Sequence, residues 1–183
     1  MNHSAILHAS FLTLTGLVSI HVADTAAANL VANPDFDADL TGWTNEVPNA
    51  YLSLDNTTGD PVAPSAHLVV SSGTTDVLSD CMVVDPSQNV DFSINIKSNS
   101  SGLIQFGLRA YSDAACSSLP VEAGNLTGSE TIWTRKEMLN FALPAGTQSV
   151  RIDMLGGADM NFDHVQFGPA GTTPVRLQSF DVR

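Results

Sequence analysis

The side chains in this sequence that could most readily bind a ligand or metal ion are carboxylates, and they are concentrated in its first half. The 183 residues include 19 acidic and 7 basic side chains, which give a formal net charge of −12. The first basic residue is Lys97, so residues 1–96 carry eleven acids and no base. Such a surface is most often simply solvated, but carboxylate oxygens are also the ligands that a hard cation such as Ca²⁺ prefers.

The charge and the motifs argue against several classes of function. Binding of nucleic acid or of an anionic membrane needs clustered Lys and Arg, which this chain lacks. We find no G-x-S-x-G, H-E-x-x-H or Gly-rich phosphate loop. Beyond residue 28 the histidines are His67 and His164, and nearly all the acids fall in predicted turns or at strand ends. We therefore expect a binding protein and not an enzyme.

Residues 1–28 have the pattern of an export signal. Residues 5–23 are apolar, interrupted by small hydroxyl residues and two histidines, and Ala26 and Ala28 give a small-x-small cleavage pattern. The basic segment that normally precedes the apolar run is missing, and a retained membrane anchor or a buried helix are the alternatives. We expect cleavage before Asn29, which leaves residues 29–183 secreted, periplasmic or at the cell surface.

Export would determine the oxidation state of the two cysteines, Cys81 and Cys116. An oxidising compartment favours a disulfide between them, which would close a loop of 35 residues. In the chain-entropy description such a loop contributes about 4 kcal/mol. Two buried free thiols are the alternative, whereas a structural zinc site would need more ligands and a C-x-x-C spacing that the chain lacks.

The mature chain alternates apolar and polar residues, which is typical of strands in a β-sandwich. In VDFSINIKS (residues 90–98) every second side chain is apolar, and the same holds in LIQFGLRAYS (residues 103–112). The turn NSSG between them predicts a hairpin. Further strands are expected at residues 67–71, 77–84, 133–143, 149–155 and 161–167, with short ones near Leu30 and Tyr51, and PAG at 144–146 is a predicted turn. The sequence therefore predicts an all-β, two-sheet antiparallel jelly roll at 29–168, and a tail at 169–183 with a candidate edge strand at 175–180.

Three segments carry a family resemblance. They are NLVANPDFD (29–37) followed by LTGW (40–43), IW (132–133) ahead of LPAGTQSVRI (143–152), and FDHV (162–165). Together they resemble the carbohydrate-binding jelly rolls of the galactose-binding-domain-like superfamily, especially the xylan- and glucan-binding modules appended to glycoside hydrolases. The resemblance covers about residues 29–168, and it implies a non-catalytic module that binds a polysaccharide or another glycan.

The resemblance also implies a structural calcium ion between the first and last strands. Its ligands would be the carboxylates of Asp37 and Asp163, the backbone carbonyl of Asp35, and the turn that contains Asp60. Two positions depart from the family pattern: Pro34 replaces the usual glycine, and Asp37 replaces a longer glutamate. In the alternative interpretation, Asp35 and Asp37 cap turns and Asp163 accepts hydrogen bonds at the end of a strand.

In these modules the polar face of one concave sheet forms the sugar cleft. The resemblance places there five outward residues of the predicted strands: Asn95, Gln105, Arg109, Tyr111 and Arg151. The tyrosine ring could stack on a sugar, and the other four could hydrogen-bond its hydroxyls. The alternative is an ordinary solvated face of a structural or adhesive surface module.

Overall fold

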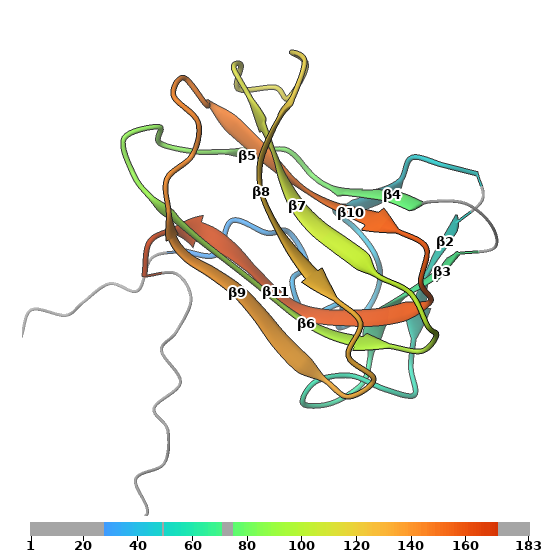
Figure 1. The fold of residues 1–183 in the computed structure, drawn as a ribbon. Coiled ribbons are helices and arrows are strands. Elements are labelled where there is room, and N and C mark those ends of the chain that lie inside the picture. Colours follow the sequence, from blue (N-terminus) through green and yellow to red (C-terminus); the bar gives the residue numbers. More distant parts are fainter. Residues whose placement is uncertain (1–27, 49, 71–74, 172–183) are drawn as a thin grey trace, which may run out of the picture.

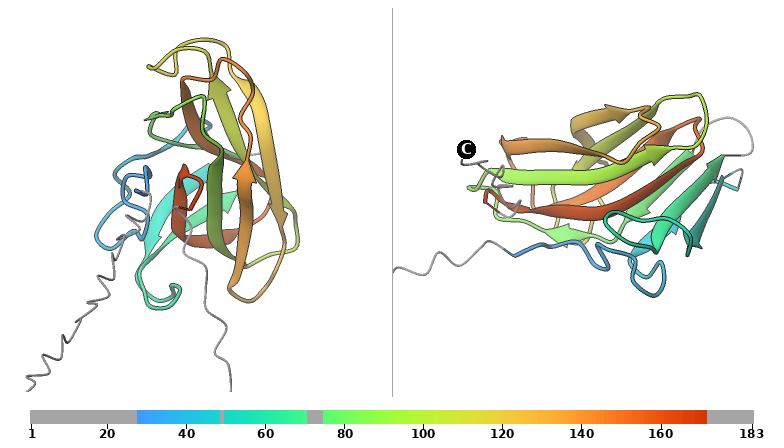
Figure 2. Two further views of the ribbon diagram at one scale, coloured as in Figure 1. Left: turned by 90° about the vertical axis from the view of Figure 1, so that its left-hand side faces the viewer. Right: turned by 90° about the horizontal axis from the view of Figure 1, so that it is seen from below.

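The computed structural model describes residues 28–48, 50–70 and 75–171, and within them the chain forms two antiparallel sheets that face each other (Figures 1 and 2). The six-stranded sheet contains β1 (Trp43–Asn45), β4 (Thr75–Ser79), β5 (Met82–Val83), β7 (Ile104–Tyr111), β8 (Val121–Gly128) and β10 (Ser149–Gly156). Its order is β1-β4-β10-β7-β8, and β5 also pairs with β10.

The five-stranded sheet has the order β2-β3-β11-β6-β9. Its members are β2 (Ala50–Asp55), β3 (Ser65–Val70), β6 (Val90–Ser98), β9 (Thr134–Phe141) and β11 (Met160–Pro169). The predicted all-β sandwich is confirmed. In the described residues there is no helix that is long and apolar enough to cross a membrane.

The core lies between the sheets and follows the alternation seen in the sequence. Phe92 and Ile94 of β6, and Phe106 and Leu108 of β7, are fully buried in one continuous apolar cluster. One end of the cluster is aromatic: Phe162 of β11 packs against Phe36 and Trp43, with ring centroids 5.1 and 5.6 Å away. These contacts fix the N-terminal segment against the last strand.

The predicted hairpin between residues 90–98 and 103–112 is wrong. β6 pairs with β11 and β9, whereas β7 pairs with β10 and β8, so the two strands belong to opposite sheets. The NSSG segment therefore crosses from one layer of the sandwich to the other. Alternation of apolar residues identifies a strand and its buried face, but it does not identify the neighbour to which the strand hydrogen-bonds.

Other element boundaries also differ from the predictions. The expected strand at 77–84 is divided into β4 and β5, and strands β1 and β8 were not predicted. Near Leu30 there is no regular strand, although the Leu30 amide donates to the Phe167 carbonyl at 2.7 Å. The turn at 144–146 is present, with the Thr147 amide donating to the Pro144 carbonyl. The predicted signal peptide (except Ala28) and the tail strand at 175–180 lie outside the described residues.

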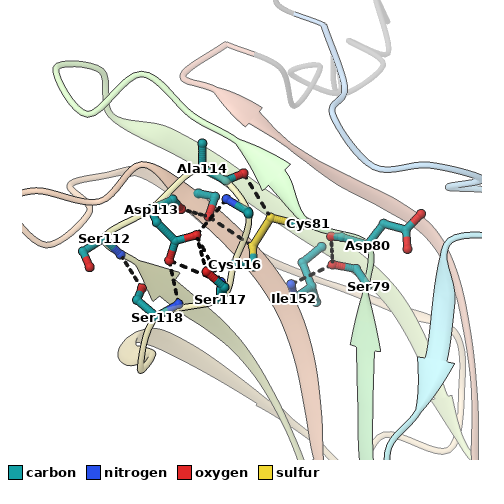
Figure 3. The surroundings of a disulfide bond; sticks show 12 residues. Ser79, Asp80, Cys81, Ser112, Asp113, Ala114, Cys116, Ser117, Ser118 and Ile152 are labelled. Carbon is teal, nitrogen blue, oxygen red and sulfur yellow. Dashed lines mark hydrogen bonds between the residues drawn. A yellow bond between two sulfur atoms is a disulfide. The ribbon is translucent and has the colours of Figure 1, made fainter.

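The predicted disulfide is confirmed. Cys81 lies between β4 and β5, and its bond to Cys116 holds the loop that follows β7, with the two Cα atoms 5.9 Å apart (Figure 3). The loop is also organised by Asp113, whose carboxylate accepts the amides of Ala115, Ser117 and Ser118. Hydrogen bonds from Ser118 and Ser117 lower the pKa of this exposed carboxyl group. The loop at this end of the six-stranded sheet is thus fixed by a covalent bond and by a carboxylate.

Candidate functional site

The structure divides the predicted ligand residues between the two sheets. Gln105, Arg109 and Tyr111 belong to β7 and Arg151 belongs to β10, so these four lie on the outer face of the six-stranded sheet, the face turned away from the other sheet. Asn95 belongs to β6 in the five-stranded sheet. The five residues therefore cannot contact one ligand together, and the six-stranded sheet holds most of them.

Strand geometry explains the orientation of these side chains. In β10 the side chains of Val150, Ile152 and Met154 enter the core, so Arg151 and Asp153 must point to the outer face. In the register with β7, Arg151 lies opposite Arg109 and Asp153 lies opposite Gly107. Two neighbouring strands thus place two guanidinium groups and a carboxylate side by side.

Arg109 is the centre of an ion-pair network that we call the Arg109 cluster, made of Arg109, Asp76, Glu122 and Asp153. The Arg109 Nε donates to Asp153 Oδ2 at 2.9 Å, and its Nη2 donates to Asp76 Oδ1 at 2.9 Å. Glu122 Oε1 lies 3.8 Å from the same Nε. The cluster spans β4, β10, β7 and β8, and it orders the Arg109 side chain across the sheet.

Asp153 is the most deeply buried member of the cluster. Its side chain has 0% exposure, and its Oδ1 has no hydrogen-bond partner. Burial, together with the nearby charge of Glu122, raises the pKa of Asp153 to about 6. Gly107 makes room for this carboxylate, because a Cβ at that position would lie 2.1 Å from Asp153 Oδ1 and 3.4 Å from Glu122 Oε2.

Two of the predicted ligand side chains are less available than expected. Tyr111 is only 6% exposed, and burial raises the pKa of its phenol, so its ring does not form an open stacking surface. Asn95 is 1% exposed and donates to Asp60 Oδ2 at 2.8 Å. On β10, the Nε of Arg151 is buried and has no partner.

Sequence reasoning missed Asp76 and Glu122 as members of the site. Asp76 immediately precedes the predicted strand at 77–84 and could have been placed by extending that strand by one residue. Glu122 lies in β8, whose sequence VEAGNLTG contains two glycines and an asparagine, residues that are depleted in strands. No alternation signal identified that strand, so its outward carboxylate could not be assigned to a face.

The four predicted calcium ligands come together at a different place, beside the five-stranded sheet. Asp35, Asp37, Asp60 and Asp163 line one cavity of about 220 Å³, together with Pro61, Val62 and His164. Asp163 is 3% exposed, and burial raises its pKa to about 6. The four acids that the resemblance names therefore line one cavity, and their role as metal ligands stays a prediction.

Carboxylates are the ligands that a hard cation prefers, but three of the four at this cavity, Asp35, Asp60 and Asp163, already contact groups of the protein. Asp163 accepts the amides of Asp60 and His164 at 2.8 Å each, and Asp35 contacts the His164 ring at 2.8 Å. Asp60 accepts from Asn95. Among the described residues, no three His, Cys, Asp or Glu side chains are grouped so that they could hold a metal ion. A calcium ion here would have to displace some of these donors and take backbone carbonyls as well.

Comparison with known proteins gives a match in structure but not in sequence. No sequence family matches the chain, and no curated protein sequence does. The CBM22-1–GH10 modules of Clostridium thermocellum endo-1,4-beta-D-xylanase 10B, in complex with xylohexaose, match with a TM-score of 0.59 and 16% identity over 78% of this chain and 29% of that one.

Two further solved structures share the fold. A xylan-binding domain from CBM 22 matches with a TM-score of 0.59 and 13% identity, covering 82% of this chain and 99% of that one. The enzymatically active domain of tailspike protein 4 from bacteriophage CBA120 matches with a TM-score of 0.60 and 12% identity, over 77% of this chain and 21% of that one. The expected likeness to carbohydrate-binding jelly rolls is confirmed at the level of the fold.

Proposed function

We propose that this protein is an exported, non-catalytic carbohydrate-binding module whose glycan lies on the outer face of the six-stranded sheet. The observation that carries the proposal is the combination of the CBM22-like fold with the polar outer face around Arg109. A fold of this kind hosts many functions, so the argument depends on the face and not on the fold alone.

The face offers the hydrogen-bonding groups that sugar hydroxyls need. Arg151 and Gln105 are partly exposed; Arg151 lies opposite Arg109, and Gln105 lies opposite Leu155, the residue that also pairs with Asp76. Both can donate to hydroxyl oxygens. The carboxylates of Asp76 and Glu122 are partly exposed and can accept from hydroxyl groups. Because Arg109 is held by two carboxylates, it is already oriented before the ligand arrives, which reduces the entropic cost of binding.

Affinity electrophoresis against a panel of soluble polysaccharides tests this proposal. We expect at least one polysaccharide to retard the protein, and we expect Gln105→Ala and Arg151→Ala to weaken the retardation. Glu137→Gln is the matched control, because Glu137 lies on β9 of the five-stranded sheet. Loss of retardation in the control, or none by any polysaccharide, would argue against a sugar site on this face.

One observation favours a second candidate, a structural or adhesive surface module without a sugar site. Sugar-binding faces commonly present an exposed aromatic ring, but Tyr111 is buried here, and the exposed Tyr51 lies on β2 of the other sheet. This alternative predicts that no polysaccharide retards the protein and that the outer-face variants bind any partner as the wild type does.

We also propose that calcium stabilises the module through Asp35, Asp37, Asp60 and Asp163. The support is that these acids line one cavity and that Asp163 is a buried carboxylate close to Asp35. Clustered carboxylates repel one another, and a divalent cation would relieve this repulsion. Binding there would join the N-terminal segment to β11.

A further inference from the structure

An apolar cavity opens at one end of the sandwich, between β5 of one sheet and the ends of β6 and β11 of the other. It has a volume of about 130 Å³, and its lining includes Leu30, Val83, Val84 and Val90 and the polar residues Asp85 and Gln88. We call it the Val83 cavity. Val83 is 61% exposed and Leu30 is 37% exposed, so part of this apolar lining faces water. An apolar cavity of roughly 150 Å³ holds a benzene molecule, so the Val83 cavity can take one aliphatic side chain.

Strand β5 offers a backbone edge beside the Val83 cavity. Among the described residues, β5 pairs with β10 alone, through Met82 and Val83. An extended segment can add to the edge of β5 that faces away from β10, because a strand edge presents backbone donors and acceptors to an incoming strand. The end of the sandwich therefore combines an edge for a backbone with a cavity for one inserted side chain.

The described part of the chain ends next to this cavity. Pro169 belongs to the cavity lining, and beyond it the amides of Ala170 and Gly171 donate to the Asn89 carbonyl at 2.9 Å and to Asp91 Oδ2 at 2.7 Å. Gly171 has a φ of 94°, and with Ala170 it forms a turn that redirects the chain after β11. The end of β11 and the loop between β5 and β6 lie at the same end of the sandwich (Figure 1). The following residues thus start within reach of the Val83 cavity.

The sequence after this turn complements the cavity in polarity and in charge. Residues 172–183, which lie outside the described residues, read TTPVRLQSFDVR. In an extended segment Val175 and Leu177 project to one side and Arg176 projects to the other. The segment contains two of the seven basic side chains of the protein and one of its nineteen acidic ones, so its charge is opposite to that of the rest. Asp85, an exposed carboxylate of the cavity lining, can pair with such a basic side chain.

From these observations we propose that residues 175–178 dock on their own chain, with Leu177 in the Val83 cavity and the backbone along the open edge of β5. The docked segment covers apolar surface of Val83 and Leu30, and the removal of this surface from water is the main driving force. Docking closes the end of the core between the two sheets. It does not depend on glycan binding, because the residues that line the cavity are not those of the Arg109 cluster.

Thermal unfolding of the full mature protein tests whether Leu177 is buried. Leu177→Asp should lower Tm by roughly 5 °C, because it takes one aliphatic side chain out of the cavity. Gln178→Asp is the matched control: it makes the same change to an acid at the neighbouring position, on the opposite side of an extended segment, and it should leave Tm unchanged within about 1 °C. Equal losses of Tm in the two variants would overturn the proposal.

A nitroxide label on a cysteine that replaces Gln178 tests where the segment lies. In NMR spectra of the labelled protein, the amide signals of Val83 and Gln88 should broaden, whereas that of Gly156, at the far end of β10, should not. Adding Leu177→Asp to the labelled protein should abolish the broadening. Broadening that persists in this variant, or that is absent from the labelled protein with Leu177 in place, would overturn the proposal.

A mixed sample separates docking within one chain from docking between two copies. Nitroxide-labelled protein without isotopes is mixed with isotope-labelled protein that carries no nitroxide, and the amide signals of the second protein are recorded. We expect no broadening of Val83 or Gln88 in the mixture. Broadening in the mixture as strong as in the singly labelled protein would show that a second copy fills the cavity, and it would overturn docking of the segment on its own chain.

Discussion

Asp153 is the side chain on the candidate face whose surroundings differ most from water. It is fully buried, one of its oxygens has no donor, and its pKa lies near 6, above the usual 3.8. The folded protein therefore holds this proton more tightly than the unfolded chain does. As a result, the contribution of Asp153 to stability is largest below pH 4 and is lost as the pH rises through 6.

The variant Asp153→Asn tests this linkage. The free energy of unfolding of the wild type, minus that of the variant, should fall by about 2 kcal/mol between pH 4 and pH 7, which is most of the energy that a shift of two pKa units represents. Urea unfolding at several pH values measures it. A difference that stays constant, or that rises with pH, would show that burial does not raise the pKa of this carboxyl group.

Position 107 needs a glycine because a larger side chain would clash with Asp153, and not because of its backbone conformation. A Cβ there would meet Asp153 Oδ1 at 2.1 Å, so Gly107→Ala must push the carboxylate away from Arg109. We expect the variant to lose about 1–3 kcal/mol of stability. In an Asp153→Ala background the same substitution should cost much less, because the clashing group is gone. Equal costs in the two backgrounds, measured by urea unfolding, would refute this explanation.

At the scale of elements, the disulfide is the feature with the most direct energetic consequence. Cys81–Cys116 closes a loop of 35 residues that includes all of β6 and β7 and joins the loop after β7 to the segment between β4 and β5 (Figure 3). Replacing both cysteines by serine should lower the free energy of unfolding by about 4 kcal/mol. A loss below about 1 kcal/mol in urea unfolding would mean that the Asp113 network alone holds this loop.

The existence of the core strands could be predicted from the sequence, but their pairing could not. Strands such as VDFSINIKS alternate strongly, and burial of Phe92, Ile94 and Ile96 enforces that pattern, so their existence and inward faces were predictable. Their partners were not predictable, because a crossing between layers and a hairpin can share the same short turn. The edge strand β8 has glycines where packing space is limited, as at Gly124 against Met138, and so it lacked a strand signature.

In the candidate site, too, the face on which a side chain lies was predictable and its partners were not. Arg109 and Arg151 could be placed on an outward face from alternation alone, and the register later put them opposite each other. Alternation also turns Asp153 outward, but the ion pairs of Arg109 could not be found from the sequence, because only the sheet order brings Asp76, Glu122 and Asp153 to it from three strands. Asn95 was assigned to the same face because the hairpin was wrongly expected.

At the scale of the whole molecule, calcium is expected to join the N-terminal segment to the last strand. Addition of Ca²⁺ at about 100 times its dissociation constant should stabilise the mature protein by about 2.7 kcal/mol. For a domain of this size that raises Tm by roughly 5–10 °C. Asp163→Asn should abolish the increase, whereas Asp85→Asn, in an exposed turn remote from the cavity, should retain it. Identical melting curves in Ca²⁺ and in EDTA would contradict the metal proposal.

Affinity electrophoresis of the mature protein shows whether the outer face of the six-stranded sheet binds a glycan. The gels should contain xylan, β-glucan, galactan, glycol chitosan or a polyuronate, with wild type, Arg151→Ala and Glu137→Gln side by side. We predict that at least one of these polysaccharides retards the wild type and Glu137→Gln, and that it retards Arg151→Ala less, with each protein compared with its own migration in a gel without polysaccharide. Unretarded migration of the wild type in every gel, or equal retardation of all three proteins, would contradict the claim.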